Sequence, residues 1–168
     1  MKLHYDWKHV RSWLHTIIRD MNKDGWKPDY IVGVTRGGLT PATMLSHYLE
    51  VPLCSLDVSF RDNGLGPESN LWMAEDAFGR DAEKKNILIV DDINDTGRTL
   101  QWIKDDWTSS CLPDDPRWQE IWNGSVRFAV MVNNMSSRFA DVDYWGTHVD
   151  KQENPCWVVF PWENWWEN

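Results

Sequence analysis

The feature that most constrains the fold is a short, uninterrupted apolar run that ends in acidic residues. The run is Asn86-Ile-Leu-Ile-Val-Asp91, followed by the loop Asp92–Gly97 and a helical stretch near Arg98–Ser109. A continuous apolar run of this length is typical of a parallel strand buried on both faces. A chain with such a strand must cover both faces of its sheet with helices.

The same order of strand, loop and helix occurs earlier in the chain. Asp29–Val34 is a mostly apolar run, Thr35–Gly38 is a loop, and Leu39–Glu50 has the apolar spacing of a helix. Further expected elements are an opening amphipathic helix over 7–21 and strands over 53–60, 126–132 and 143–145. This order predicts an α/β fold with a parallel central sheet flanked by helices, and the 168 residues suffice for a single domain.

Composition and charge exclude several classes of protein. The net charge is −9, with 17 basic against 26 acidic residues, so a nucleic-acid partner is not expected. No apolar run approaches the roughly 20 residues that span a bilayer, so no membrane partner is expected. The three cysteines have no metal-ligand spacing, which favours reduced thiols in a cytoplasmic protein.

The loop after the central strand carries groups that can bind an anion and a polyol. Thr96, Gly97 and Thr99 offer hydroxyls and accessible backbone N–H groups at a helix start, where the helix dipole favours a phosphate. Asp91 and Asp92 could accept from two vicinal hydroxyls or bind magnesium. Asp95 could act as a base, although all three acids could also be simple strand-end and helix-cap residues.

This loop, Val90-Asp-Asp-Ile-Asn-Asp-Thr-Gly-Arg-Thr99, resembles the signature of the type I phosphoribosyltransferases for phosphoribosyl pyrophosphate (PRPP). The resemblance implies that Asp91 and Asp92 bind the ribose hydroxyls, with Asp92 sharing a mostly substrate-held Mg²⁺. It implies that Asp95–Thr99, including Arg98, binds the 5′-phosphate. It also implies that Asp95 accepts the proton at the purine N7.

The loop after the first strand is a second match, Ile31-Val-Gly-Val-Thr-Arg-Gly-Gly-Leu-Thr-Pro-Ala42. Gly37 and Gly38 allow a close backbone approach to an anion, beside the fixed charge of Arg36. On its own this could be a tight turn. Beside the first match it resembles the family's pyrophosphate loop, which implies that Thr35, Arg36, Gly37 and Gly38 hold the leaving group.

Two further segments are similar to parts of the same family. Ser59-Phe60 and the following residues, about 60–85, have no clear periodicity and stand where the family has a flexible lid that excludes water. The alternative for this stretch is a solvated surface loop. The tail, about 136–168, resembles the C-terminal hood of the xanthine-guanine and hypoxanthine-guanine enzymes of bacteria and archaea, and leaves a core of about 1–135.

The hood resemblance implies how a base would be bound. The Trp157 ring would stack on a purine, and backbone groups around Val158 would read its edge. Where these enzymes usually carry a base-reading lysine, this chain has Asn134, or Asn133 under a shifted alignment. An asparagine amide can donate to an oxo group or accept from an amino group, so it leaves the base preference open.

The resemblance implies phosphoribosyl transfer from PRPP to a 6-oxopurine, giving a nucleoside 5′-monophosphate and pyrophosphate. It also implies Mg²⁺ as cofactor and a homo-oligomer, either a dimer or a tetramer. Two alternatives remain: an enzyme with another acceptor base, and a non-catalytic regulator that binds PRPP or a nucleotide on the same fold.

Overall fold

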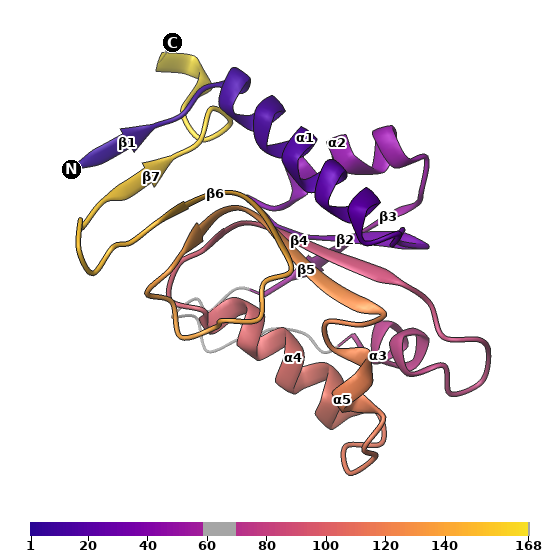
Figure 1. Cartoon of the computed structure of the whole chain (residues 1–168). Coiled ribbons are helices and arrows are strands. Elements are labelled where there is room, and N and C mark those ends of the chain that lie inside the picture. The colour runs from indigo at the N-terminus through magenta and orange to yellow at the C-terminus, as the bar shows by residue number, and fades with distance from the viewer. Residues whose placement is uncertain (59–69, 168) are drawn as a thin grey trace.

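The five runs that the sequence marks as strands form one parallel sheet. The computed structural model describes residues 1–58 and 70–167. Its central sheet has the strand order β3-β2-β4-β5-β6, in which every neighbouring pair is parallel (Figure 1). The strands are β2 (Tyr30–Thr35), β3 (Leu53–Asp57), β4 (Ile87–Asn94), β5 (Val126–Asn134) and β6 (Tyr144–Val149). The predicted α/β fold is therefore confirmed.

Helices cover both faces of this sheet (Figure 1). Residues alternate along a strand, so β4 sends Ile87 and Ile89 to one face and Leu88 and Val90 to the other, all fully buried. One face packs against α1 (Trp7–Lys23) and α2 (Leu39–Leu49), and the other packs against α3 (Leu71–Phe78), α4 (Arg98–Ser110) and α5 (Trp118–Ile121). Burial of both faces explains why the first four residues of β4, Ile87–Val90, are apolar without interruption.

Helix α3 corrects the predicted extent of the lid. The lid was expected to continue to about residue 85, but residues 71–78 form a helix whose Met73, Ala74 and Phe78 side chains lie in the core. Side chains buried in this way cannot swing over a ligand without opening the core. The helix was not predicted because only eight residues carry its pattern.

Strand β6 corrects the predicted boundary of the hood. The hood was expected to begin near residue 136, but Tyr144–Val149 pairs with β5 and extends the central sheet. The segment that lies apart from this sheet is β7 (Trp157–Val159), with the short helix η1 (Trp165–Glu167) after it.

A second, two-stranded parallel sheet joins the two ends of the chain. Strand β7 pairs with β1 (Lys2–His4), so that Leu3 lies opposite Val158. Figure 1 shows this small sheet at one end of the molecule, next to the start of α1. Strands of three residues carry too little sequence pattern for prediction, and this pairing depends on residues far apart in the chain.

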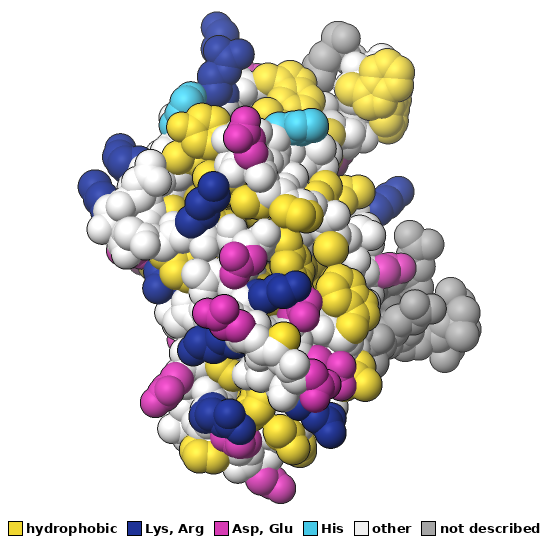
Figure 2. Space-filling view, turned by 90° about the vertical axis from the view of Figure 1, so that its right-hand side faces the viewer, with side chains coloured by type: hydrophobic (Ala, Val, Ile, Leu, Met, Phe, Trp, Pro, Cys, Tyr) yellow, Lys and Arg dark blue, Asp and Glu magenta, His cyan; other side chains and the backbone are white. Residues whose placement is uncertain are grey.

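The surface carries charges of both signs. On the face shown in Figure 2, Lys and Arg side chains lie interspersed with Asp and Glu and with single hydrophobic side chains. No helix among the described residues is both long and apolar enough to cross a bilayer.

Candidate active site

The two loops singled out in the sequence meet at one edge of the sheet. They follow β2 and β4, which are hydrogen-bonded neighbours, so both lie at the carboxyl ends of adjacent parallel strands. Gly38 is packed so closely that an added Cβ would lie 2.7 Å from Asp91 Cα and 2.8 Å from Val34 O. This edge is where open α/β sheets bind their ligands.

Asp91, which is buried, and Asp92, which is half-buried, form a pair of carboxylates beside these loops. The Asp91 side chain accepts from the Asp92 backbone N–H at 2.8 Å, and Asp92 accepts from the Ile93 N–H at 2.7 Å. Burial, and then repulsion by Asp92, raises the pKa of Asp91 well above its ordinary value. Burial also raises the pKa of Asp92. Two carboxylates in this position are electrostatically unfavourable, so a cation or two hydroxyl donors would stabilise them.

The loop from β4 to α4 encloses an anion-sized space. A cavity of about 190 Å³ is lined by residues 91–100, including Thr96, Gly97 and Thr99. Gly97 has φ of 90°, and a Cβ there would collide with Phe139, so only glycine fits this turn. Gly97 caps α4 without a side-chain hydrogen bond, which leaves the start of the helix for a ligand.

The loop after β2 lies beside the paired carboxylates. Thr35 ends β2, its hydroxyl donates to Leu56 O at 3.4 Å, and the Thr35–Arg36 peptide bond is cis. The Arg36 side chain is exposed, and the Gly38 N–H donates to Val34 O at 2.9 Å. Of the four residues expected to bind pyrophosphate (Thr35, Arg36, Gly37 and Gly38), Gly37 lies against Asp92 and Gly38 against Asp91.

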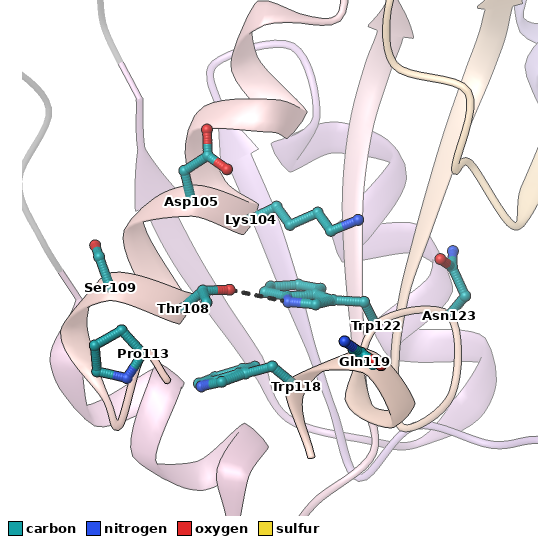
Figure 3. A pocket seen from close by; sticks show the side chains of 9 residues that line it. All are labelled: Lys104, Asp105, Thr108, Ser109, Pro113, Trp118, Gln119, Trp122 and Asn123. Carbon is teal, nitrogen blue, oxygen red and sulfur yellow. Dashed lines mark hydrogen bonds between the residues drawn. The ribbon is translucent and has the colours of Figure 1, made fainter. Parts of the chain in front are cut away.

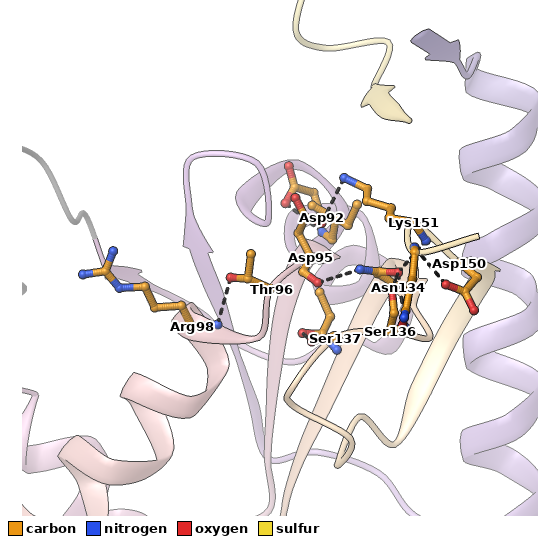
Figure 4. A network of polar contacts seen from close by, with 12 residues as sticks. Asp92, Asp95, Thr96, Arg98, Asn134, Ser136, Ser137, Asp150 and Lys151 are labelled. Carbon is orange, nitrogen blue, oxygen red and sulfur yellow. Dashed lines mark hydrogen bonds and ion pairs between the residues drawn. The ribbon is translucent and has the colours of Figure 1, made fainter. Parts of the chain in front are cut away.

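Asp95 is paired with a lysine that the sequence analysis did not identify. Lys151 Nζ lies 2.9 Å from Asp95 Oδ1, and the Lys151 side chain is only 17% exposed. The lysine follows β6, whereas Asp95 follows β4, so no local pattern joins them. Figure 4 shows the two side chains pointing toward one another.

Asn134 lies under this ion pair. Its Nδ2 donates to Asp95 O at 2.9 Å, and its Oδ1 accepts from the Lys151 N–H at 3.0 Å and from the Ser136 hydroxyl at 2.9 Å (Figure 4). Asn133, the other asparagine considered, accepts from Asn94 Nδ2 at 2.9 Å. Both side chains are buried. The Asn134 oxygen thus serves protein donors, which differs from the expected contact with a base.

The hood places an exposed aromatic ring on the other side of Lys151. The Trp157 ring is 64% exposed, and Lys151 Nζ lies 6.0 Å from its centroid. Trp157 N–H donates to Met1 O and Val159 O accepts from Tyr5 N–H. Backbone groups alternate along a strand, so those of Val158 point away from β1. They are available to a ligand at that edge.

The second tryptophan of the hood has a packing role. The Trp162 ring stacks on Phe160, with centroids 4.8 Å apart and planes inclined by 4°, and lies 5.9 Å from the ring of Trp7. Trp162 therefore supports the hood from inside, whereas Trp157 faces outward.

Two further charged residues near these loops, Arg138 and Glu163, were not given a role from the sequence. The Arg138 backbone N–H donates to Thr96 O at 3.2 Å, and Arg138 lines a cavity of about 520 Å³ together with Arg98. Desolvation, and to a smaller extent repulsion by Asp92, raises the pKa of Glu163. Both follow segments without strong periodicity, so only the fold brings them here. Ser59 and Phe60, predicted to open the lid, lie outside the described residues.

Another concave surface of the molecule lies away from these residues. Figure 3 shows a groove of about 540 Å³ between α4 and α5 that shares no residue with the loops described above. Its Trp118 and Trp122 rings stack with centroids 5.6 Å apart, and Trp122 Nε1 donates to the Thr108 hydroxyl at 3.1 Å. Both indoles are nearly buried, so they serve the core.

The carboxylates provide part of a magnesium site. Asp91 and Asp92 are oxygen ligands of the kind Mg²⁺ prefers, and their raised pKa values are the expected result of burying acids that a cation would neutralise. Among residues 1–58 and 70–167, no cluster of three or more His, Cys, Asp or Glu side chains could hold a metal. The residues fit a metal ion only if a substrate supplies most of its ligands.

Comparison with known proteins identifies the family. A family model described as "Phosphoribosyl transferase domain" matches residues 5–165. The xanthine-guanine phosphoribosyltransferase of Desulfotalea psychrophila is 28% identical over 163 residues, covering 96% of this chain and 82% of that protein. That of Cereibacter sphaeroides is 29% identical over 147 residues, with 83% and 75% covered.

A solved structure has the same fold along almost the whole chain. The purine phosphoribosyltransferase from Pyrococcus horikoshii superimposes with a TM-score of 0.66 at 26% identity, covering 96% of this chain and 94% of that one. Since the family model also spans nearly every residue described here, the chain belongs to the phosphoribosyl transferase domain family.

Proposed function

We propose that the protein transfers the 5-phosphoribosyl group of PRPP to a 6-oxopurine, giving a nucleoside 5′-monophosphate and pyrophosphate. The observation that carries this proposal is the contact between the two loops: Gly37 and Gly38 pack directly against Asp91 and Asp92 at the carboxyl edge of β2 and β4. One ligand with a phosphate, a diol and a pyrophosphate would contact both loops at once. The names of the similar proteins support a purine as acceptor.

Each loop has one part of PRPP to bind. The N–H groups at the start of α4 and the Thr96 and Thr99 hydroxyls would hold the 5′-phosphate. Asp91 and Asp92 would accept from the ribose hydroxyls, which relieves the cost of burying two acids. The loop 35–38, with the Arg36 charge, would hold the pyrophosphate as it leaves.

The base would lie between the loop after β4 and the hood. Trp157 offers an exposed ring for stacking, and the outward backbone groups of Val158 offer hydrogen bonds to the base edge. As the base nitrogen bonds to ribose C1′, the bond from C1′ to pyrophosphate breaks and pyrophosphate keeps the electron pair. Asp95 would accept the N7 proton.

We propose Mg²⁺ as cofactor, held by Asp92 and Asp91 together with substrate oxygens. When bound, it would supply positive charge that offsets the charge of the pyrophosphate leaving group. The protein itself positions the Asp92 carboxylate against Gly37, in space that the Cβ atom of any other residue would occupy.

We also propose that the protein is a cytoplasmic homo-oligomer. Its three cysteines are free, as expected in a reducing compartment. Exposed aromatic side chains such as Trp165 and Trp166, 70% and 66% exposed, are typical of a surface that a second copy covers. Sedimentation velocity would test the oligomer.

The test is pyrophosphate release from PRPP and Mg²⁺, with guanine, hypoxanthine, xanthine and adenine offered separately. Release with one of the first three bases supports the proposal and names the substrate. Release only with adenine would keep the reaction and overturn the base. Absence of release with all four, with calorimetric binding of PRPP, would favour a regulator or an untested acceptor.

A further inference from the structure

Lys151 is a largely buried cation next to Asp95, the residue proposed to accept the N7 proton. Its Nζ lies 2.9 Å from Asp95 Oδ1, with the side chain 17% exposed. Burying an ammonium group costs free energy, and an ion pair that is only half buried returns little of it. Because the Asp95 side chain is 42% exposed, the ion pair adds little to the stability of the fold, and that contribution alone does not explain why a lysine is buried here.

The backbone holds this lysine in place through Asn134. One amide side chain donates to the Asp95 carbonyl at 2.9 Å and accepts from the Lys151 N–H at 3.0 Å. Asn134 therefore fixes the relative positions of two segments that follow β4 and β6, the strands on either side of β5 (Figure 4). A second hydrogen bond, from the Ser136 hydroxyl to Asn134 Oδ1, locks the amide in this orientation. Fixed positions of this kind are what recognition of a small ligand requires.

The Trp157 ring gives the direction from which a ligand would meet this pair. Its centroid lies 6.0 Å from Lys151 Nζ, and the ring is exposed. A planar base stacked on Trp157 would bring an edge to both the ammonium and the Asp95 carboxylate. That edge meets one charged donor and one charged acceptor about one hydrogen-bond length apart.

We infer that Lys151 is the residue that selects a 6-oxo group on the base. An oxo oxygen beside an N–H matches a side-by-side donor and acceptor, because the ammonium donates to the oxygen and the carboxylate accepts from the nitrogen. A 6-amino group would instead point N–H bonds at the ammonium, which has no lone pair to accept them. This inference rests on the proposed function and adds the residue that sets its substrate class.

The same contact prepares Asp95 for its role. Lys151 contacts one oxygen of the Asp95 carboxylate, Oδ1, at 2.9 Å. A base oxygen that takes over the ammonium would leave Asp95 to accept the N7 proton. The lysine keeps its own protons throughout, so the only proton that moves goes from N7 to Asp95.

The experiment compares the Lys151→Met and Lys151→Arg variants with the unaltered protein. The control is Lys104→Met, which removes a partly buried lysine of α4, 27% exposed, that pairs with Asp141 at 3.2 Å in the groove away from the proposed site. For each protein, kcat and the KM values are measured for the four bases and for PRPP. Thermal unfolding shows whether each variant is folded, and Lys151→Gln replaces Lys151→Met if the latter is not.

Loss of Lys151 is expected to raise KM for the favoured 6-oxopurine about 10- to 100-fold, the effect of one hydrogen bond to a charged group. KM for PRPP should change less than about twofold, and the preference for oxo over amino bases should fall. Lys151→Arg should keep most of that preference, and Lys104→Met should behave like the unaltered protein.

Two results would contradict the role inferred for Lys151. If Lys151→Met and its replacement keep the base KM and the preference against adenine, Lys151 does not read the base. If KM for the base and for PRPP rise equally, the lysine has a general structural role and the inference is wrong. These outcomes require that the unaltered protein turns over a base, so they are distinct from the case in which it releases no pyrophosphate and the proposed function itself fails.

Discussion

A Cβ atom added at Gly37 would overlap the carboxylate of Asp92. Gly37 lies in the loop after β2 and Asp92 near the carboxyl end of β4, far apart in the chain, yet no side chain fits between them. The glycine therefore serves a contact between these two segments, in addition to the turn in its own loop. Under the proposed function, this contact would allow one PRPP molecule to reach both segments.

Gly37→Ala is expected to weaken PRPP binding by at least about tenfold, because the methyl group must displace Asp92 or the loop after β2. Isothermal calorimetry with PRPP and Mg²⁺ measures this directly. Gly25→Ala is the control: Gly25 has φ of 61° and open space around it, so that variant should lose stability but keep its PRPP affinity. Equal affinity in both variants would contradict the role given to Gly37.

Asp91→Asn is expected to stabilise the protein without ligand at neutral pH. The unfolded chain releases the Asp91 proton near pH 4, whereas burial and Asp92 keep it bound to higher pH in the folded protein. Over that interval the folded state binds more protons, so the stability contribution of Asp91 falls as pH rises. The amide side chain of the Asp91→Asn variant cannot ionise, so the variant does not lose stability in this way as pH rises.

Thermal unfolding of both proteins between pH 4 and 8 measures the effect. The Tm advantage of Asp91→Asn should grow with pH and exceed about 2 °C at pH 8, roughly 1 kcal/mol for a domain of this size. The same variant should lose PRPP binding. Parallel Tm curves across this range would show that Asp91 titrates normally in the folded protein.

Asp95→Asn is expected to lower kcat about 100-fold or more, because an amide cannot accept the N7 proton. PRPP should still bind with a Kd within about threefold, since the 5′-phosphate contacts come mainly from the start of α4. Asp114→Asn removes an exposed carboxylate beyond the end of α4 and serves as the control. Unchanged kcat in Asp95→Asn would remove Asp95 from the mechanism.

Trp157→Ala is expected to raise KM for the base about tenfold, the value of one stacking contact, with little change in KM for PRPP. Trp72→Ala is a matched control, since Trp72 is also about half exposed and stacks on Tyr30 at 6.1 Å. A similar loss for base and PRPP in Trp157→Ala would make that ring a structural support of the hood.

Both ligand loops could be predicted because their chemistry is local. Asp91, Asp92 and the turn at Gly97 follow one another along the chain, directly after a strand whose apolar run is unmistakable. The parallel sheet then follows from the order of strand, loop and helix. That the two loops meet depends on the pairing of β2 with β4, which the structure shows and the sequence did not predict.

The base side of the site could not be predicted in this way. Asp95, Asn134 and Lys151 come from three segments, and their hydrogen bonds depend on β5 and β6 having joined the sheet. The sequence showed an asparagine at the place expected for a lysine. It did not show that a lysine after β6 reaches Asp95, because tertiary packing, and no pattern along the chain, sets that 2.9 Å distance.

The same reason separates the two hood tryptophans and limits the lid. Trp157 and Trp162 look alike in sequence, and only the pairing of β7 with β1 turns one ring outward and stacks the other on Phe160. Helix α3 lies in a charged stretch whose short apolar pattern did not predict a helix, and the structure shows that its apolar face packs into the core. The sequence determined the strands and the polar groups at the ends of β2 and β4, since these depend on neighbours along the chain. The tertiary structure decided the order of the strands in the sheet and which side chains meet around Asp95, since these depend on contacts between segments far apart in the sequence.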